Sequence, residues 1–95
     1  MQSHDILSTI GNTPLIKLSL PGLNLKAELL AKQESRNPLG SVKDRVAFSM
    51  IEAGIADKTI TSDSIIIEPT SGNTGLGLAL ICAAKKLRLV LTMPE

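Results

Sequence analysis

The sequence predicts an α/β fold in which helices flank a parallel sheet. The first observation is a strand–helix–strand unit, because apolar runs at 64–68 and 89–93 enclose a largely apolar helical segment at 74–86. Strands joined in this way pair in parallel, with a right-handed crossover. The second observation is composition, since 43% hydrophobic and 20% charged residues are typical of a globular domain.

The N-terminal third contains short elements. A short helix or turn is expected around 5–10, followed by a Gly-Asn-Thr-Pro break. Two extended segments, 15–18 and 25–30, follow on either side of the turn-forming pair Pro21-Gly22. Both segments are interpreted as strands.

The remaining elements alternate between helix and strand. A helix is expected at 41–56 and a polar loop at 57–64. The run Ser-Ile-Ile-Ile-Glu at 64–68 suits a strand that is buried on both faces. Because a parallel sheet needs helices on both faces and further strands beside it, the sequence is interpreted as the front part of a longer α/β protein.

Composition and charge exclude several function classes. The net charge of +1 and a single aromatic residue, Phe48, favour neither polyanions nor single-stranded nucleic acid. The longest apolar run, 76–84, is too short to span a bilayer, and the first residues lack a signal-peptide pattern. Cys82 is the only cysteine, which predicts a core thiol and a cytoplasmic location. No metal site is expected, because His4 has no second His or Cys nearby.

Lys43 lies in the first turn of the expected helix, where a cation is disfavoured by roughly 0.3–1 kcal/mol. Ser41 is a suitable N-cap, and Asp44 completes a Ser-x-x-Asp capping box. Lys43 then heads a stripe of apolar residues three, four and seven positions later, namely Val46, Ala47 and Met50. Lys43 is therefore expected to point inward.

An inward-pointing Lys43 would be reactive. Desolvation and the positive helix end would both lower its pKa, and a neutral lysine amine can form a Schiff base. The alternative is an ordinary lysine that extends to solvent. Arg45 shares a side with Ser49 and Glu52 and is expected to be solvated, so Asp44 and Arg45 are interpreted as capping and surface-pairing residues.

A second candidate site is the loop Glu-Pro-Thr-Ser-Gly-Asn-Thr-Gly at 68–75, between a strand and a helix. Open α/β sheets bind ligands at this position. Glycines allow close approach of the backbone, and free amides of the first helical turn attract anions. Side chains add hydrogen-bonding groups at Thr70, Ser71, Asn73 and Thr74. One interpretation of this loop is a binding site for a carboxylate or a phosphate. The other, equally consistent with the sequence, is an ordinary capped loop that binds no ligand.

Three motifs occur in order along the chain, IGNTPL at 10–15, NPLGSVKDR at 37–45 and EPTSGNTG at 68–75, and LTMPE closes it. Together they resemble the N-terminal part of the cysteine synthase (O-acetylserine sulfhydrylase) family of fold type II pyridoxal phosphate enzymes. The resemblance implies two parts. Residues 1–34 supply strands that pack on the large domain in the family, and residues 35–95 begin the small α/β domain with its lysine helix and substrate loop.

The resemblance also implies roles for individual residues. Lys43 matches the lysine that binds pyridoxal 5'-phosphate and later moves the α-proton of the substrate. Asn73 matches the residue that hydrogen-bonds the ring hydroxyl oxygen of the cofactor. The substrate-binding loop, which holds the α-carboxylate, is matched by Thr70, Ser71, Gly72, Asn73 and Thr74. The implied transferase reaction is a β-replacement, in which O-acetylserine and sulfide give L-cysteine and acetate.

The resemblance implies partners and a limit as well. Members of the family are usually homodimers, and they bind serine acetyltransferase, whose C-terminal tail enters the active site. The family's phosphate-binding glycine loop, and the Ser or Thr that contacts the pyridine nitrogen, are not among these 95 residues. The chain alone is therefore expected to be a truncated, inactive form.

Several alternatives stay open. Cystathionine β-synthase, O-phosphoserine-type sulfhydrylases and diaminopropionate-type synthases share most of these motifs. The plain TSGNTG loop, and a start close to IGNTPL without a haem-binding extension, favour cysteine synthase. Serine and threonine dehydratases resemble the chain less closely. An alternative of another class is a non-catalytic piece that binds the C-terminal peptide of serine acetyltransferase through the 70–74 loop.

Overall fold

The structure, a computed structural model, describes residues 5–95. His4, for which no metal role is expected, lies outside these residues. No helix in the described part of the chain is long and apolar enough to cross a membrane. The elements are, in chain order, η1 Ile6–Thr9, β1 Leu15–Lys17, β2 Leu30–Lys32, η2 Glu34–Arg36, α1 Lys43–Ala56, β3 Ile65–Pro69, α2 Asn73–Lys85 and β4 Arg88–Thr92.

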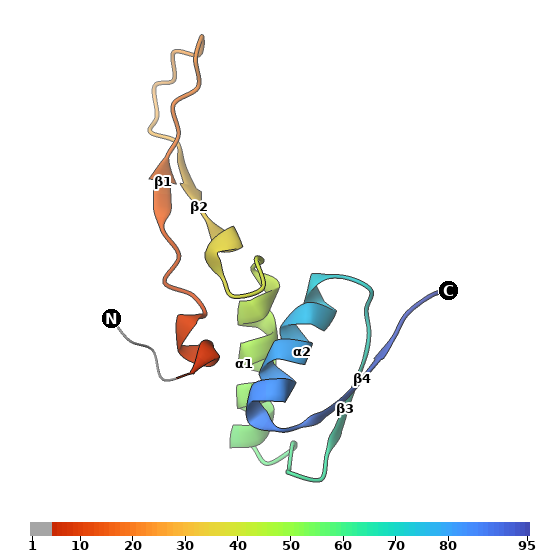
Figure 1. Cartoon of the computed structure of the whole chain (residues 1–95). Helices are drawn as coiled ribbons and strands as arrows, with labels where there is room; N and C mark the ends of the chain where they lie inside the picture. Colours follow the sequence, from red (N-terminus) through yellow and green to blue (C-terminus); the bar gives the residue numbers. More distant parts are fainter. Residues whose placement is uncertain (1–4) are drawn as a thin grey trace.

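The C-terminal half contains the predicted strand–helix–strand unit. β3 and β4 pair in parallel, with Ile65 opposite Arg88 and Pro69 opposite Thr92. α2 packs against β4, and α1 packs against α2 on the side away from the sheet (Figure 1). The prediction of an α/β fold with a parallel sheet is confirmed, and the bounds of these four elements lie within two residues of those predicted.

The hydrophobic core lies between the two long helices. Its fully buried apolar residues are Ala47, Ile51, Leu78, Ile81 and Cys82. Partly buried Ile66 and Leu89 bring one face of the sheet against them. Burial raises the pKa of the Cys82 thiol, so the predicted core thiol is confirmed.

The prediction that β3 is buried on both faces is wrong. Ile66 packs against the core, whereas Ile65 and Ile67 are 50% and 62% exposed. Both long helices lie on one side of the sheet (Figure 1), so alternate side chains of β3 face away from them. A continuous apolar run permits burial of the second face, but other parts of a protein must supply the cover.

The N-terminal hairpin extends away from the helix pair as an arm, which we define as residues 15–32 (Figure 1). β1 and β2 pair antiparallel, with Leu15 opposite Lys32. The second strand was predicted at 25–30 and this is wrong, because only residues opposite β1 form ladder bonds. Beyond the ladder the Leu18 amide donates to the Leu29 carbonyl at one end, and the Gln33 amide donates to the Pro14 carbonyl at the other, each over 2.9 Å.

The turn predicted at Pro21-Gly22 is confirmed. The Leu23 amide donates to the Leu20 carbonyl over 3.2 Å, and Gly22 has a φ of +82°, which a glycine adopts readily. The short helix expected near residue 5 is also present, as η1, and the Asp5 side chain accepts the Ser8 amide.

The described chain is elongated. Its radius of gyration is 17.1 Å, whereas a compact chain of this length has about 12 Å. The arm carries exposed apolar side chains, with Leu15 at 58% and Leu23 at 61% exposure. The predicted division of the chain into two parts, 1–34 and 35–95, stays a prediction.

Candidate active site

α1 and α2 run in the same direction, so both helices begin at the same end of the molecule (Figure 1). Near this end the Lys43 carbonyl lies against Gly77, where an added Cβ would be 2.9 Å from the carbonyl oxygen. Near the other end Glu52 of α1 forms an ion pair with Lys85 of α2. The carboxyl end of β3 leads directly into α2, so two positive helix ends and the carboxyl edge of the sheet meet in one region.

The loop between β3 and α2 is folded around a threonine hydroxyl. Thr70 Oγ1 accepts from the backbone amide of Gly75 over 3.2 Å and from that of Gly72 over 3.3 Å. The amides of Asn73 and Thr74 lie in the first turn of α2, where the helix itself offers no acceptor. The loop is therefore ordered by Thr70 and leaves backbone donors at the helix end, as an anion site requires.

A pocket of about 340 Å³ opens beside this loop. Its lining includes the apolar residues Leu76, Leu91 and Met93. Four of the five predicted substrate-binding residues also line it, namely Thr70, Ser71, Gly72 and Asn73. Thr74 is half-buried and, like Lys43, does not line this pocket. The roles assigned to these residues stay predictions.

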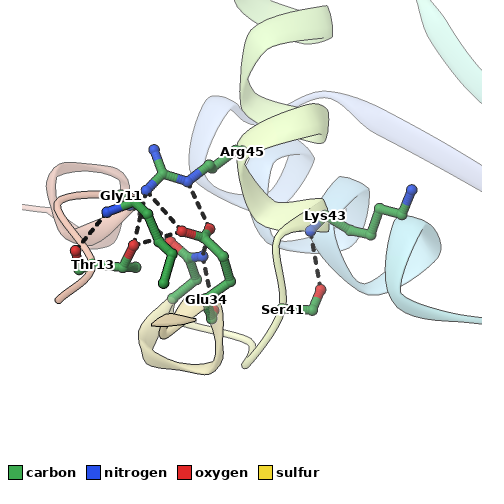
Figure 2. Close-up of polar contacts among 8 residues, drawn as sticks. Gly11, Thr13, Glu34, Ser41, Lys43 and Arg45 are labelled. Atoms are coloured by element: carbon green, nitrogen blue, oxygen red, sulfur yellow. Dashed lines mark hydrogen bonds and ion pairs between the residues drawn. The ribbon is translucent and has the colours of Figure 1, made fainter. Parts of the chain in front are cut away.

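Lys43 is the first residue of α1, and its amide donates to Ser41 Oγ over 3.1 Å. Its side chain is exposed, and Figure 2 shows it directed away from Arg45 and toward α2. Within residues 5–95 no carboxylate lies within ion-pair distance of its amine. The Lys43 amine is therefore accessible to a ligand.

The prediction that Lys43 points inward is wrong. The buried residues of α1 are Asp44, Ala47 and Ile51. Val46 and Met50, from the predicted stripe, are 39% and 46% exposed. The buried face is thus rotated by one residue, roughly 100°, from the predicted one. Because the Lys43 side chain is exposed, the described residues do not provide the desolvation that was expected there.

Asp44 is not the capping residue that was predicted. α1 follows Val42 without a side-chain cap, and Asp44 is 0% exposed. Asp44 Oδ2 accepts from the Leu39 amide over 2.8 Å, so it bonds to the preceding loop and not to Ser41. Asp44 Oδ1 has no hydrogen-bond partner in the described residues.

Arg45 was predicted to be a solvated, surface-pairing residue. Its side chain is 38% exposed and forms an ion pair with Glu34, so the surface pairing is confirmed, but the side chain is not simply solvated. Arg45 joins a polar cluster, here called the latch, whose side chains belong to Thr13, Glu34, Asn37 and Arg45 (Figure 2). Arg45 Nε and Nη2 donate to the two carboxylate oxygens of Glu34 over 2.7 and 3.1 Å. Arg45 Nη2 also lies 3.1 Å from Thr13 Oγ1.

The latch connects three segments that are distant in the sequence. Asn37 Nδ2 donates to Glu34 Oε2 over 2.9 Å, and Asn37 Oδ1 accepts from the Gly11 amide over 2.8 Å. Thr13 Oγ1 donates to Glu34 Oε1 over 2.5 Å. The GNTP segment, the end of the hairpin and the start of α1 are therefore held together.

The latch changes the ionisation of its members. Hydrogen bonds from Arg45, and then from Thr13, hold the pKa of Glu34 at about 2, below its ordinary value of 4.5. The hydrogen bond to Glu34 raises the pKa of Arg45 in turn. The ion pair is therefore intact throughout the neutral range.

The depressed pKa of Glu34 predicts a pH dependence of stability. Below pH 4.5 the unfolded chain takes up a proton at Glu34 that the folded chain does not, so folding loses this contribution as the pH falls toward about 2. The difference in free energy of unfolding between the unchanged chain and Glu34→Gln should be constant above pH 4.5. It should decrease as the pH falls from 4.5 toward about 2. Urea unfolding followed by circular dichroism at several pH values measures the difference. In an Arg45→Met background the decrease should largely disappear, and a constant difference in the unchanged background would contradict the prediction.

Thr13, Glu34 and Asn37 were not predicted as members of a site. Glu34 and Arg45 are eleven residues apart and lie in different elements, so no helix or strand period relates them. One signal could have indicated the contact. Thr13 belongs to the IGNTPL motif, and Asn37 and Arg45 belong to NPLGSVKDR, so the latch joins two of the three motifs.

Comparisons with known proteins agree with this arrangement. Residues 6–95 match the family described as "Pyridoxal-phosphate dependent enzyme". The chain is 50% identical to a cysteine synthase from Flavobacterium sp. over 95 residues, which cover 100% of this chain and 31% of that protein. It is 53% identical to a cystathionine beta-synthase from Saccharomyces cerevisiae over 95 residues, which cover 97% of this chain and 19% of that protein. The crystal structure of O-acetyl serine sulfhydrylase isoform 3 from Entamoeba histolytica matches with a TM-score of 0.92 and 40% identity, covering 100% of this chain and 30% of that one.

Proposed function

The chain belongs to the pyridoxal-phosphate dependent enzyme family, and we propose that it forms the lysine-bearing part of an enzyme that makes L-cysteine from O-acetylserine and sulfide. The chain spans about a third or less of the length of the relatives compared above, so this activity is proposed for the whole enzyme. The observation that carries the proposal is the shared helix end. It brings an accessible lysine to the same end of the molecule as a loop with free backbone amides.

The residues at this end fit the reactive part of pyridoxal phosphate. Lys43 offers a primary amine without an ion-pair partner in the described chain, as attachment to an aldehyde requires. Asn73 is exposed at the pocket and can bond a ring oxygen. When bound, the cofactor supplies an electron sink that stabilises negative charge on the substrate Cα.

The chain's own residues would then bind the substrate and move its proton. The amides of the first turn of α2, with the Ser71 and Thr74 hydroxyls, would hold the α-carboxylate. The Lys43 amine would remove the proton from Cα, and acetate would leave from Cβ. Sulfide would add at the same Cβ, and the proton would return to Cα from Lys43. The balance is O-acetylserine plus hydrogen sulfide to cysteine plus acetate.

The same helix end suits a peptide carboxylate. The proposal therefore includes binding of the C-terminal tail of serine acetyltransferase at the 70–74 loop, and a homodimer of the whole enzyme. Because the glycine-rich phosphate loop implied by the family resemblance is not among these 95 residues, we do not expect cysteine formation by this chain without further residues.

Cystathionine synthesis is the second candidate, because the identity to the yeast cystathionine beta-synthase is as high as that to the cysteine synthase. The two reactions differ in the sulfur nucleophile, which is sulfide for cysteine and homocysteine for cystathionine. The leaving group does not separate them, because a similar solved structure is an "O-acetylserine dependent cystathionine beta-synthase" from Helicobacter pylori.

Absorbance spectra of the purified chain with pyridoxal phosphate test the proposal. Lysine-bound cofactor should give a visible band, and O-acetylserine should shift it at lower concentrations than L-serine does. Reversal of the shift by homocysteine and not by sulfide would favour cystathionine synthesis. If the spectrum with the chain is identical to that of free pyridoxal phosphate mixed with a simple amine, Lys43 and the 70–74 loop do not form the proposed site.

A further inference from the structure

We propose that the latch positions Lys43, by fixing the rotation of the first turn of α1 about the helix axis. This inference rests on the proposed function, because it concerns the lysine that would hold the cofactor. It goes beyond that function by assigning a role to residues that contact neither the pocket nor the Lys43 side chain.

Three successive residues at the start of α1 have different surroundings. Lys43 is exposed, Asp44 is 0% exposed and bonded to the Leu39 amide, and Arg45 is bonded to Glu34. Successive residues of a helix project about 100° apart. The Asp44 and Arg45 side chains are thus anchored to two different segments. With these two fixed, the direction in which Lys43 projects from the helix is fixed as well.

The start of α1 has few other restraints on the side of Arg45. The Ser41 hydroxyl accepts from the Lys43 amide, Asp44 accepts from the Leu39 amide, and the Lys43 carbonyl lies against Gly77. The buried apolar residues of α1 begin at Ala47, one turn after Lys43. Without the latch, the first turn would therefore unwind or rotate more readily while the rest of the helix stays packed.

The chemistry of the ion pair suits orientation more than stability. Both side chains are partly exposed, 38% for Arg45 and 22% for Glu34, and pairs of this kind contribute little to stability. Arg45, however, contacts both oxygens of the carboxylate, and a planar two-point contact specifies direction. Figure 2 shows the consequence, since the Lys43 side chain extends away from the latch.

Reductive labelling of the chain tests the proposal. Pyridoxal phosphate is added, borohydride fixes it on the lysines that hold it, and peptide mass spectrometry gives the ratio of label on Lys43 to label on exposed Lys58. In Arg45→Met and Glu34→Gln the ratio should fall by roughly tenfold or more, since small misplacement of a reacting group has effects of this size. The control is Ile51→Val, which weakens the core without touching the latch, and its ratio should not change. All labelling is done under solution conditions in which circular dichroism shows each variant to be folded.

Two results would overturn the proposal. One is an unchanged labelling ratio in folded Arg45→Met and Glu34→Gln. The other comes from hydrogen exchange, which does not depend on the cofactor. The amides of residues 47–49 bond to the carbonyls of residues 43–45, so they should exchange several-fold faster in the latch variants than in the unchanged chain, with residues 53–56 unaffected. Equal exchange of residues 47–49 in the latch variants and in the unchanged chain would refute the latch as a positioning device.

The proposed function can fail separately. If Lys43 of the unchanged chain is labelled no more than Lys58, the lysine assignment is wrong. The hydrogen-exchange result then decides alone whether the latch holds the first turn of α1.

Discussion

Replacing Lys43 with alanine is expected to abolish stable retention of pyridoxal phosphate by the chain. Lys58 and Lys85 lie near the opposite end of the helix pair, and the amine of Lys32 is already bonded to the Thr13 carbonyl. Gel filtration after incubation with the cofactor, followed by absorbance, should show a visible band for the unchanged chain and background absorbance for the variant.

The same substitution should not harm the fold, and this separates chemistry from stability. The Lys43 side chain is exposed and makes no ion pair within the described residues. A cation in the first turn of a helix is disfavoured by roughly 0.3–1 kcal/mol, so Lys43→Ala should leave the free energy of unfolding unchanged or raise it slightly. Urea unfolding measures this effect.

Two further variants serve as controls for Lys43→Ala. Lys58→Ala removes an exposed lysine outside the proposed site and should retain the cofactor. Lys43→Arg keeps the charge but lacks a nucleophilic amine, so it should lose the cofactor as the alanine variant does. Retention by Lys43→Ala at the level of the unchanged chain would remove Lys43 from the proposed mechanism.

Replacing Gly77 with leucine is expected to destabilise the chain by about 3 kcal/mol or more, or to prevent folding. α2 approaches α1 closely at Gly77, since an added Cβ would lie 2.9 Å from the Lys43 carbonyl oxygen and 3.1 Å from Ala47 Cβ. The Lys43 contact is with backbone, so relief requires movement of α1 itself. A larger residue would also move Lys43 away from the loop at the start of α2.

The smaller change Gly77→Ala sets two effects against each other. Alanine is the better helix former by about 1 kcal/mol, whereas overpacking typically costs about 1–3 kcal/mol. Because the contact is with backbone, we expect the packing term to exceed the propensity term, giving a net loss of about 1 kcal/mol.

The matched control for Gly77→Leu is Ala84→Leu, at an exposed position of the same helix. It adds similar bulk outside the helix contact and should change the free energy of unfolding by less than about 0.5 kcal/mol. Equal stability of Gly77→Leu and the unchanged chain would show that the close approach of the two helices is not a structural requirement.

The sequence by itself determined the elements of the C-terminal half and their order. The β-branched run before the EPTSGNTG loop, the apolar helix after it and the next strand are local patterns, and β3, α2 and β4 lie within one or two residues of them. The motifs likewise indicated the family, which the match over residues 6–95 shows. Both are properties of short stretches of chain, so no knowledge of distant contacts was needed.

Only the tertiary structure decided how α1 is rotated. The stripe through Val46 and Met50 is as apolar as the face that is buried, so helical periodicity could not choose between them. The choice depends on Asp44, whose carboxylate can be buried because the Leu39 amide bonds to it. It depends equally on Glu34, which binds Arg45 from another element. Side chains from distant segments supply these partners, so the direction of Lys43 is a property of the assembled fold and not of the helix that carries it.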